Sequence, residues 1–293
     1  FQAEDGIRDL VLSLVGSEMC IRDIPMTNTG KEKQYLLVHP EAYEDAKHSY
    51  FNSLDKAVSL CRSGSGSLRC LDIGSGMGLF LVAMHERGHK ACGVEPQAEL
   101  IERAEENCRF MGFEPEIREG CAEDIPFPDD TFDIIINNSV LEHVQDWEVA
   151  AEECMRCLKP GGVLFVETTN RQHPRQWEVN DFPFFSWLPH RVQRRYVRYC
   201  LEKRPDKINH TPIPVRFFFT HRQLKKKFSR LGGLPYDRYD LFNPEWFRGK
   251  KSALAPLARL FKVPLVKWFL YFPTPMTKLY IVKDKEPSSP DPM

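Results

Sequence analysis

The chain has 293 residues, of which 42% are hydrophobic and 28% are charged, with a formal net charge of −1. This composition suits one large globular domain, or one domain with a substantial elaboration. The sequence has no internal repeat and no apolar run of 18 residues or more, which argues against a membrane-spanning helix. Its nine cysteines lack the spacing of a disulfide framework, so we expect a cytoplasmic protein.

Charge is unevenly distributed along the chain. Residues 24–170 hold 13 Lys and Arg against 26 Asp and Glu, whereas residues 171–270 hold 22 against 7. This asymmetry predicts two regions with different partners.

The two ends of the sequence are set aside. Residues 1–23 resemble translated sequencing-adapter read-through, so we expect the native protein to start near Ile24 to Met26. They have no basic region typical of a secretory signal. Residues 286–293 are rich in Pro and Ser and are expected to be disordered.

Strands and helices are predicted to alternate through the first half of the chain. A helix over 41–61 belongs to an N-terminal helical segment, 24–67. The elements that follow are strand Leu68–Ile73, helix Met77–Arg87, strand Lys90–Glu95, helix Gln97–Met111, strand Pro115–Arg118, strand Phe132–Asn137, helix Trp147–Leu158 and strand Val163–Thr168. The sequence Lys159–Gly162 is expected to stop the last helix. Strict alternation predicts an α/β fold with a doubly wound parallel sheet.

After Thr169 the alternation ends. Residues 171–219 are aromatic, basic and interrupted by proline, and we expect them to form an inserted helical cap on the acceptor side. Residues 220–285 are expected to complete the sheet. They contain a helix N-capped by Thr220 and closed by Gly232 and Gly233, then strands over Tyr236–Phe242 and Leu279–Val282.

A glycine-rich turn follows the first strand of this sheet. Gly74, Gly76 and Gly78 permit a tight turn and a close approach of backbone to a ligand, although a tight turn alone also explains them. Asp72 would repel a pyrophosphate but suits a cation or an ammonium group. Glu95, at the end of the second strand, is placed to accept hydrogen bonds from two ribose hydroxyls. The pattern therefore favours a ligand with a ribose, a positive charge and no pyrophosphate, such as S-adenosylmethionine.

Four segments in this region resemble the class I S-adenosylmethionine-dependent methyltransferases, in particular the type-11 domain group. They are LDIGSGMGLF, GVEPQAELIERA, GCAEDIPFPDDTFDIIINNSVLEHV and LKPGGVLFVETTN, and they span about 68–170. The resemblance implies a Rossmann-like seven-stranded sheet whose last pair is antiparallel, with S-adenosylmethionine as cofactor and no metal.

The resemblance also implies roles for individual residues. The cofactor-binding set is Asp72, Gly74, Ser75, Gly76, Gly78, Glu95, Pro96, Gln97, Ala122, Glu123, Asn138, Ser139 and Leu141. Many relatives have Asp where this chain has Cys121, and a thiol is a weak hydrogen-bond partner. Adenine is then contacted by Glu123, by Asp124 or by main chain alone.

Three residues are candidates for a catalytic base: His143, His173 and Glu178. His143 lies in the segment VLEHV, which occurs in family members that methylate many different acceptors. A structural or pocket-lining role for His143 is therefore favoured over the role of catalytic base. His173 and Glu178 follow the fifth strand, where acceptor pockets are commonly built, and each is otherwise an ordinary loop residue.

The acceptor is expected to be a small molecule, a glycan or a lipid-linked group, and O-methylation is favoured. The chain lacks the N-P-P-[YF] signature, which disfavours nucleic acid bases. The basic and aromatic residues of 254–273 suit an anionic membrane surface, a long anionic substrate, RNA, or simply a solvated basic face. Two other functions stay open: a dinucleotide-dependent oxidoreductase and a non-catalytic binding protein. Cys154 and Cys157 form a C-x-x-C without a second pair, which we interpret as coincidence.

Overall fold

The structure is a computed structural model that describes residues 40–209, 214–241 and 263–284. The adapter-like segment, the expected native start and the tail at 286–293 lie outside the described residues. The described residues form two compact units. The core unit holds 40–166, 225–235 and 280–284, and the second unit holds 167–209, 214–224, 236–241 and 263–279.

A seven-stranded mixed sheet runs through the described residues in the order β3-β2-β1-β4-β5-β7-β6, with an antiparallel last pair. The strands are β1 Arg69–Ile73, β2 Lys90–Glu95, β3 Glu116–Glu119, β4 Phe132–Asn138, β5 Leu158–Thr169, β6 Gly233–Asp237 and β7 Met276–Lys283. The helices before β5 are α3 Pro40–Leu60, α4 Leu79–Glu86, α5 Ala98–Phe110 and α6 Trp147–Cys157. The predicted α/β Rossmann-like fold is confirmed.

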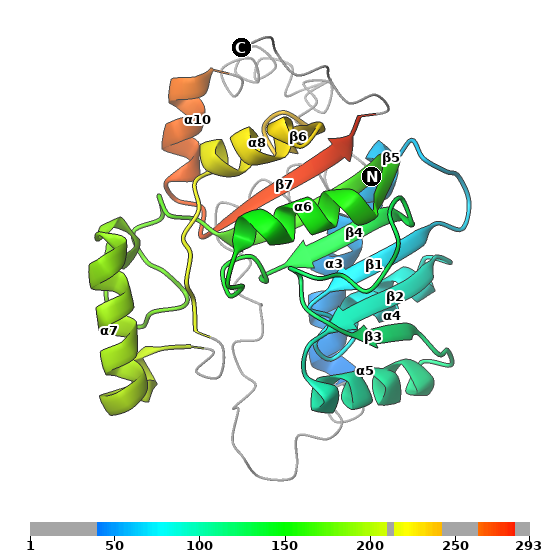
Figure 1. The fold of residues 1–293 in the computed structure, drawn as a ribbon, viewed down its shortest axis with the longest axis horizontal. Coiled ribbons are helices and arrows are strands. Elements are labelled where there is room, and N and C mark those ends of the chain that lie inside the picture. Colours follow the sequence, from blue (N-terminus) through cyan, green and yellow to red (C-terminus); the bar gives the residue numbers. More distant parts are fainter. Residues whose placement is uncertain (1–39, 210–213, 242–262, 285–293) are drawn as a thin grey trace, which may run out of the picture. The chain divides into compact units, whose positions relative to one another are not determined.

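The strand order reverses between β1 and β4. From β1 the chain proceeds to β2 on one side, and from β4 it proceeds to β5 on the other. Right-handed crossovers in opposite directions put the helices on opposite faces of the sheet: Figure 1 shows α6 in front of the sheet and α3 and α4 behind it. In such sheets ligands bind where the strand order reverses, outside the carboxyl ends of the strands.

Two strand predictions in this sheet are wrong at their boundaries. β5 begins at Leu158, directly after α6, so Lys159–Gly162 belongs to the strand instead of a separating loop. β6 spans Gly233–Asp237 instead of Tyr236–Phe242. The carboxylate of Asp237 accepts hydrogen bonds from the N–H groups of Tyr239 and Asp240 at 2.8 Å each. This side-chain turn ends the strand.

The second unit has an apolar core of its own around α7, His190–Lys203. Val179, Phe185, Val197 and Phe218 are among its buried members. One α-helix and two short 3₁₀ turns, Phe185–Trp187 (η1) and Pro205–Lys207 (η2), occupy the described part of the region expected to be a helical cap. This unit also contains α10, Pro264–Tyr271.

Helix α8, His221–Arg230, begins as predicted. The N–H of Gln223 donates to Oγ1 of Thr220 at 3.2 Å, which is the expected N-cap.

Candidate cofactor site

The glycine turn after β1 is held against β2 by its backbone. The N–H groups of Gly74 and Ser75 both donate to the carbonyl of Val94, at 2.8 and 3.1 Å. Gly74 has φ of 67°, and a Cβ built on it would lie 2.6 Å from Cγ2 of Val140. Position 74 therefore requires glycine for its left-handed conformation and for its packing against the residue that follows β4.

Asp72 is a buried acid at the carboxyl end of β1. Its side chain is 4% exposed. Burial raises the pKa of this carboxyl well above its ordinary value, and the negative charge of Glu95 raises it further. A buried carboxylate beside a second one is costly in a free protein and becomes favourable when a cation binds. An ionised Asp72 at this place would favour a positively charged ligand group.

Glu95 connects β2 to the glycine turn. Its Oε2 accepts a hydrogen bond from the N–H of Gly76 at 3.0 Å, and its Oε1 accepts one from the N–H of Gln97 at 3.2 Å. Burial raises the pKa of Glu95, while these two N–H donors lower it. A carboxylate oxygen can accept more than one hydrogen bond, so both oxygens keep capacity for ligand hydroxyls.

Ser75 contributes a buried hydroxyl at the centre of the turn. Its Oγ has no hydrogen-bond partner among the described residues. A Cβ on Gly93 of β2 would lie 2.9 Å from this Oγ, so the strand makes room for the serine by having a glycine. Sequence reasoning did not single out Gly93, although a glycine inside a strand is a known signal of close approach. An unpartnered buried hydroxyl is a group that a ligand can satisfy.

The segment after β3 is the expected adenine side of the site. Ala122 is buried, and Cys121 is exposed. Oε1 of Glu123 accepts hydrogen bonds from the N–H groups of Gln145 and Asp146, at 2.7 and 3.3 Å. This oxygen thus holds the loop before α6. Three groups were expected as adenine contacts: Glu123, Asp124 or the main chain. Because Glu123 already accepts two backbone hydrogen bonds, Asp124 or the main chain is favoured as the adenine contact.

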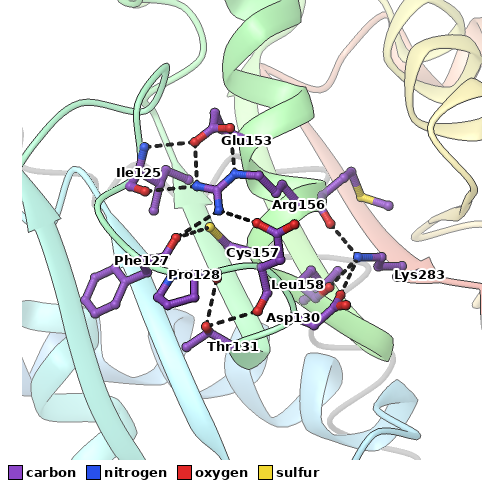
Figure 2. Close-up of polar contacts among 12 residues, drawn as sticks. Ile125, Phe127, Pro128, Asp130, Thr131, Glu153, Arg156, Cys157, Leu158 and Lys283 are labelled. Carbon is purple, nitrogen blue, oxygen red and sulfur yellow. Dashed lines mark hydrogen bonds and ion pairs between the residues drawn. The ribbon is translucent and has the colours of Figure 1, made fainter.

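Arg156 of α6 fastens the far end of this segment (Figure 2). Its guanidinium donates to the carbonyls of Phe127 and Ile125, at 2.9 and 3.0 Å, and pairs with Glu153 at 2.7 Å. Oε2 of Glu153 accepts the N–H of Ile125 at 3.1 Å. The residues from 122 to 127 are therefore anchored at both ends, to α6 and to the loop before it. Nothing in the sequence singled out this arginine.

The end of β4 forms the remaining side. Asn138 is half-buried, and Ser139 has φ of 57°, a left-handed conformation that non-glycine residues rarely adopt. Such strained backbone is concentrated at functional sites. Leu141 is fully buried and His143 is half-buried. Pro96 and Gln97 are exposed at the start of α5, where Gln97 is the N-cap residue.

Residues 71–166 match the family model described as a methyltransferase domain. This segment of the chain is therefore similar to that domain family. A solved S-adenosylmethionine-dependent methyltransferase from Mesorhizobium loti shares its fold, with a TM-score of 0.50 and 16% identity over 78% of this chain and 96% of that one.

Curated relatives also match part of the chain. The ubiquinone biosynthesis O-methyltransferase of Rhizobium etli is 36% identical over 104 residues, which are 36% of this chain and 42% of that protein. The enzyme of the same name from Chelativorans sp. is 40% identical over 104 residues, 36% of this chain and 41% of that protein. The chain thus spans about two fifths of the length of these relatives.

All the expected cofactor residues lie in the core unit, at the carboxyl ends of β1, β2 and β4 and in the turns that follow them, or in the segment after β3. His173 and Glu178 lie in the second unit. Glu178 is buried, and the ring of His173 contacts the carbonyl of Arg175. Their catalytic role stays a prediction.

Cys154 and Cys157 both lie buried on α6. Burial raises the pKa of their thiols, to about 12 for Cys154 and about 11 for Cys157. Thiols this hard to ionise are poor metal or redox groups, which supports the interpretation of this C-x-x-C as coincidence.

Proposed function

We propose that this protein transfers a methyl group from S-adenosylmethionine to an oxygen atom of a small-molecule, glycan or lipid-linked acceptor. The observation that carries the proposal is the pair of buried carboxylates, Asp72 and Glu95, beside a glycine turn in a methyltransferase domain. The two curated relatives are O-methyltransferases by name, which favours oxygen as the acceptor atom. The proposal includes no metal ion.

The residues present fit this cofactor. Asp72 offers a buried negative charge for the ammonium of the methionine part, and Glu95 offers two carboxylate oxygens for the ribose hydroxyls. The Gly74–Gly78 turn leaves room beside the backbone, and the hydroxyl of Ser75 supplies a buried polar atom still to be satisfied. When bound, S-adenosylmethionine supplies a methyl group activated by a positively charged sulfur.

The protein's own tasks are orientation and removal of one proton. Methyl transfer to a hydroxyl would form a carbon–oxygen bond, break the bond between the methyl carbon and the sulfur, and leave S-adenosylhomocysteine as product. The hydroxyl proton is released as well, so a base within hydrogen-bond reach of it is useful. His143, His173 and Glu178 are the proposed candidates, with His143 placed first in a pocket-lining role. The glycan and lipid-linked acceptor classes, and the low weight given to nucleic acid, rest on the sequence alone.

A dinucleotide-dependent oxidoreductase is the competing enzyme class, and Asp72 disfavours it because a buried carboxylate would repel a pyrophosphate. Thermal unfolding with S-adenosylhomocysteine and with NADH separates the two. We expect the first ligand to raise the melting temperature and the second to leave it unchanged. A shift with NADH alone would overturn the cofactor assignment.

Transfer itself is tested with S-adenosylmethionine labelled on the methyl group and a fractionated lipid and glycan extract. We expect label in a small-molecule, lipid or glycan fraction, and no label with Asp72→Asn. Cofactor binding without label in any fraction would favour a non-catalytic binding protein. Label found only in RNA or protein would contradict the proposed acceptor class.

A further inference from the structure

Helix α10 in the second unit has its polarity reversed. Lys267 points inward: its side chain is 12% exposed and its Nζ lies 3.2 Å from Oδ2 of the fully buried Asp237, with Asp240 as a second partner. Tyr271 is also buried and donates its hydroxyl hydrogen bond to Asp237. A helix on the surface of a water-soluble domain normally places its charge outward and its apolar residues inward.

The outward residues of α10 are large and apolar. Leu265 is 68% exposed, Trp268 52% and Phe269 62%. The buried ion pairs of Lys267 hold the helix in this orientation, because turning the apolar side inward would break them and strand Asp237 as an unpaired buried charge. The exposure is therefore built into the fold of the second unit.

Neighbouring residues of the same unit extend this apolar surface. The rings of Trp187 and Phe272 lie edge to face with centroids 6.3 Å apart, and Phe184 contacts Trp187 at 4.9 Å. All three side chains are exposed. We call the set the aromatic patch; its members are Phe184, Trp187, Leu265, Trp268, Phe269 and Phe272. A contiguous exposed apolar surface marks an interaction site.

Positive charge accompanies the patch in this unit. Helix α7 follows Trp187 closely in the chain and exposes four arginines within two turns, Arg191, Arg194, Arg195 and Arg198. None of the four forms an ion pair with a described residue. Val192 and Tyr199 are exposed on the same helix. In the sequence, the segment before α10 adds further basic residues, Arg248, Lys250, Lys251, Arg259 and Lys262, against one acid, Glu245.

We propose that the aromatic patch and the α7 arginines dock the second unit onto an anionic lipid bilayer. Tryptophan, phenylalanine and leucine side chains insert at the level of lipid headgroups, and exposed arginines of the same unit pair with lipid phosphates. The aliphatic Leu265 is the most exposed member of the patch, and it offers no flat ring on which a nucleic acid base could stack. Bilayer binding is therefore favoured over RNA binding. The proposal is independent of methyl transfer.

The test uses the full chain with vesicles of phosphatidylcholine alone or mixed with phosphatidylglycerol. We expect the protein to float with the anionic vesicles and not with the neutral ones. Binding weakens as salt rises, because salt screens the arginines. The double variant Trp268→Ser, Phe269→Ser loses flotation. Arg195→Gln weakens it about fivefold, which corresponds to about 1 kcal/mol for one basic residue near the surface.

Matched controls come from the core unit. Phe110 is 59% exposed on α5, so Phe110→Ser removes one exposed phenylalanine outside the patch, and Arg109→Gln removes one exposed arginine outside α7. Neither control changes flotation. Circular dichroism of the patch variants confirms that they fold, because the mutated side chains are exposed.

Any one of four results would overturn the proposal. The first is wild-type protein that stays unbound with anionic vesicles, and the second is equal loss of flotation in the Phe110 control. The third is a dimer that buries the aromatic patch. Sedimentation would then show a dimer for the wild type and a monomer for the double variant. Binding to an RNA oligonucleotide without vesicle binding would equally contradict it.

Discussion

Oε2 of Glu95 accepts a hydrogen bond from the backbone N–H of Gly76 at 3.0 Å, so the last residue of β2 is tied to the turn that follows β1. Asp72 lies near the end of the neighbouring strand, β1, and is opposite Gly93 of β2 in the register of the two strands. Burial raises the pKa of Asp72, and the negative charge of Glu95 raises it further. The geometry of the turn and the electrostatics of Asp72 therefore both depend on the carboxylate of Glu95.

Asp72→Asn should separate stability from binding. Because burial disfavours the ionised form of Asp72, removing its charge should leave the free energy of unfolding unchanged or raise it by roughly 1–2 kcal/mol. Affinity for S-adenosylhomocysteine should fall roughly tenfold or more, the scale of one charge-assisted hydrogen bond of about 1.5–3 kcal/mol. Urea unfolding and calorimetric titration measure the two quantities. Wild-type affinity in this variant would remove Asp72 from the site.

Cofactor affinity should rise with pH in the acidic range. The folded-state pKa of Asp72 is raised above its ordinary value of 3.8. Between that value and the raised one, the folded state holds a proton that the unfolded state has lost, so stability decreases as pH rises through this interval. Binding of an ammonium group has the opposite sign, because it requires the ionised carboxylate. Calorimetric titration with S-adenosylhomocysteine at a series of pH values from acid to neutral measures this dependence. In Asp72→Asn, the affinity should vary less with pH than in the wild type.

Gly74→Ala should be more damaging than an alanine at another left-handed glycine. Gly88 has φ of 77°, and its added Cβ would meet nothing within 4 Å, whereas at Gly74 the added Cβ would lie 2.6 Å from Val140. We expect a loss of about 1–2 kcal/mol at Gly88 from backbone strain alone. Gly74→Ala should cost about 1–3 kcal/mol more from the collision, and should weaken cofactor binding. Equal losses in urea unfolding would show that packing against Val140 is unimportant.

Arg156→Gln should loosen the adenine side. The substitution removes the guanidinium that donates to the carbonyls of Ile125 and Phe127 and pairs with Glu153. We therefore expect a loss of roughly 2–4 kcal/mol in stability. Cofactor affinity, measured where the variant remains folded, should also decrease.

The control for this variant is Arg109→Gln, which breaks one exposed pair with Glu105. It should change stability by less than about 0.5 kcal/mol. An Arg156 variant with wild-type cofactor affinity would show that the loop does not need this anchor.

The sequence predicts the sheet well because its signals are local. β2 has the predicted bounds, Lys90–Glu95, and β1 begins within one residue of its prediction. Both are apolar runs that end at a turn, and the Gly74–Gly78 motif fixes where the first crossover starts. β6 was misplaced because the side chain of Asp237 forms a turn that hydrophobic pattern alone does not indicate.

The sequence pattern could not predict contacts between residues that are far apart in the chain. Glu123 was expected near adenine, and nothing local indicates that one of its oxygens binds the N–H groups of Gln145 and Asp146. The anchor at Arg156 depends likewise on a loop about 30 residues away in the chain. The apolar residues of α10 define one face of the helix, but the sequence does not show whether that face points inward or outward. The ion pair of Lys267 with the buried Asp237 determines that it points outward.

The central claim is that Asp72 and Glu95 bind S-adenosylmethionine, and calorimetric titration of the wild-type protein with S-adenosylhomocysteine tests it most directly. We predict saturable binding of one ligand per chain at neutral pH, strongly weakened in Asp72→Asn and unaffected in Gly88→Ala. Absence of heat of binding in a protein shown to be folded, or equal binding by the Asp72 variant, would contradict the account.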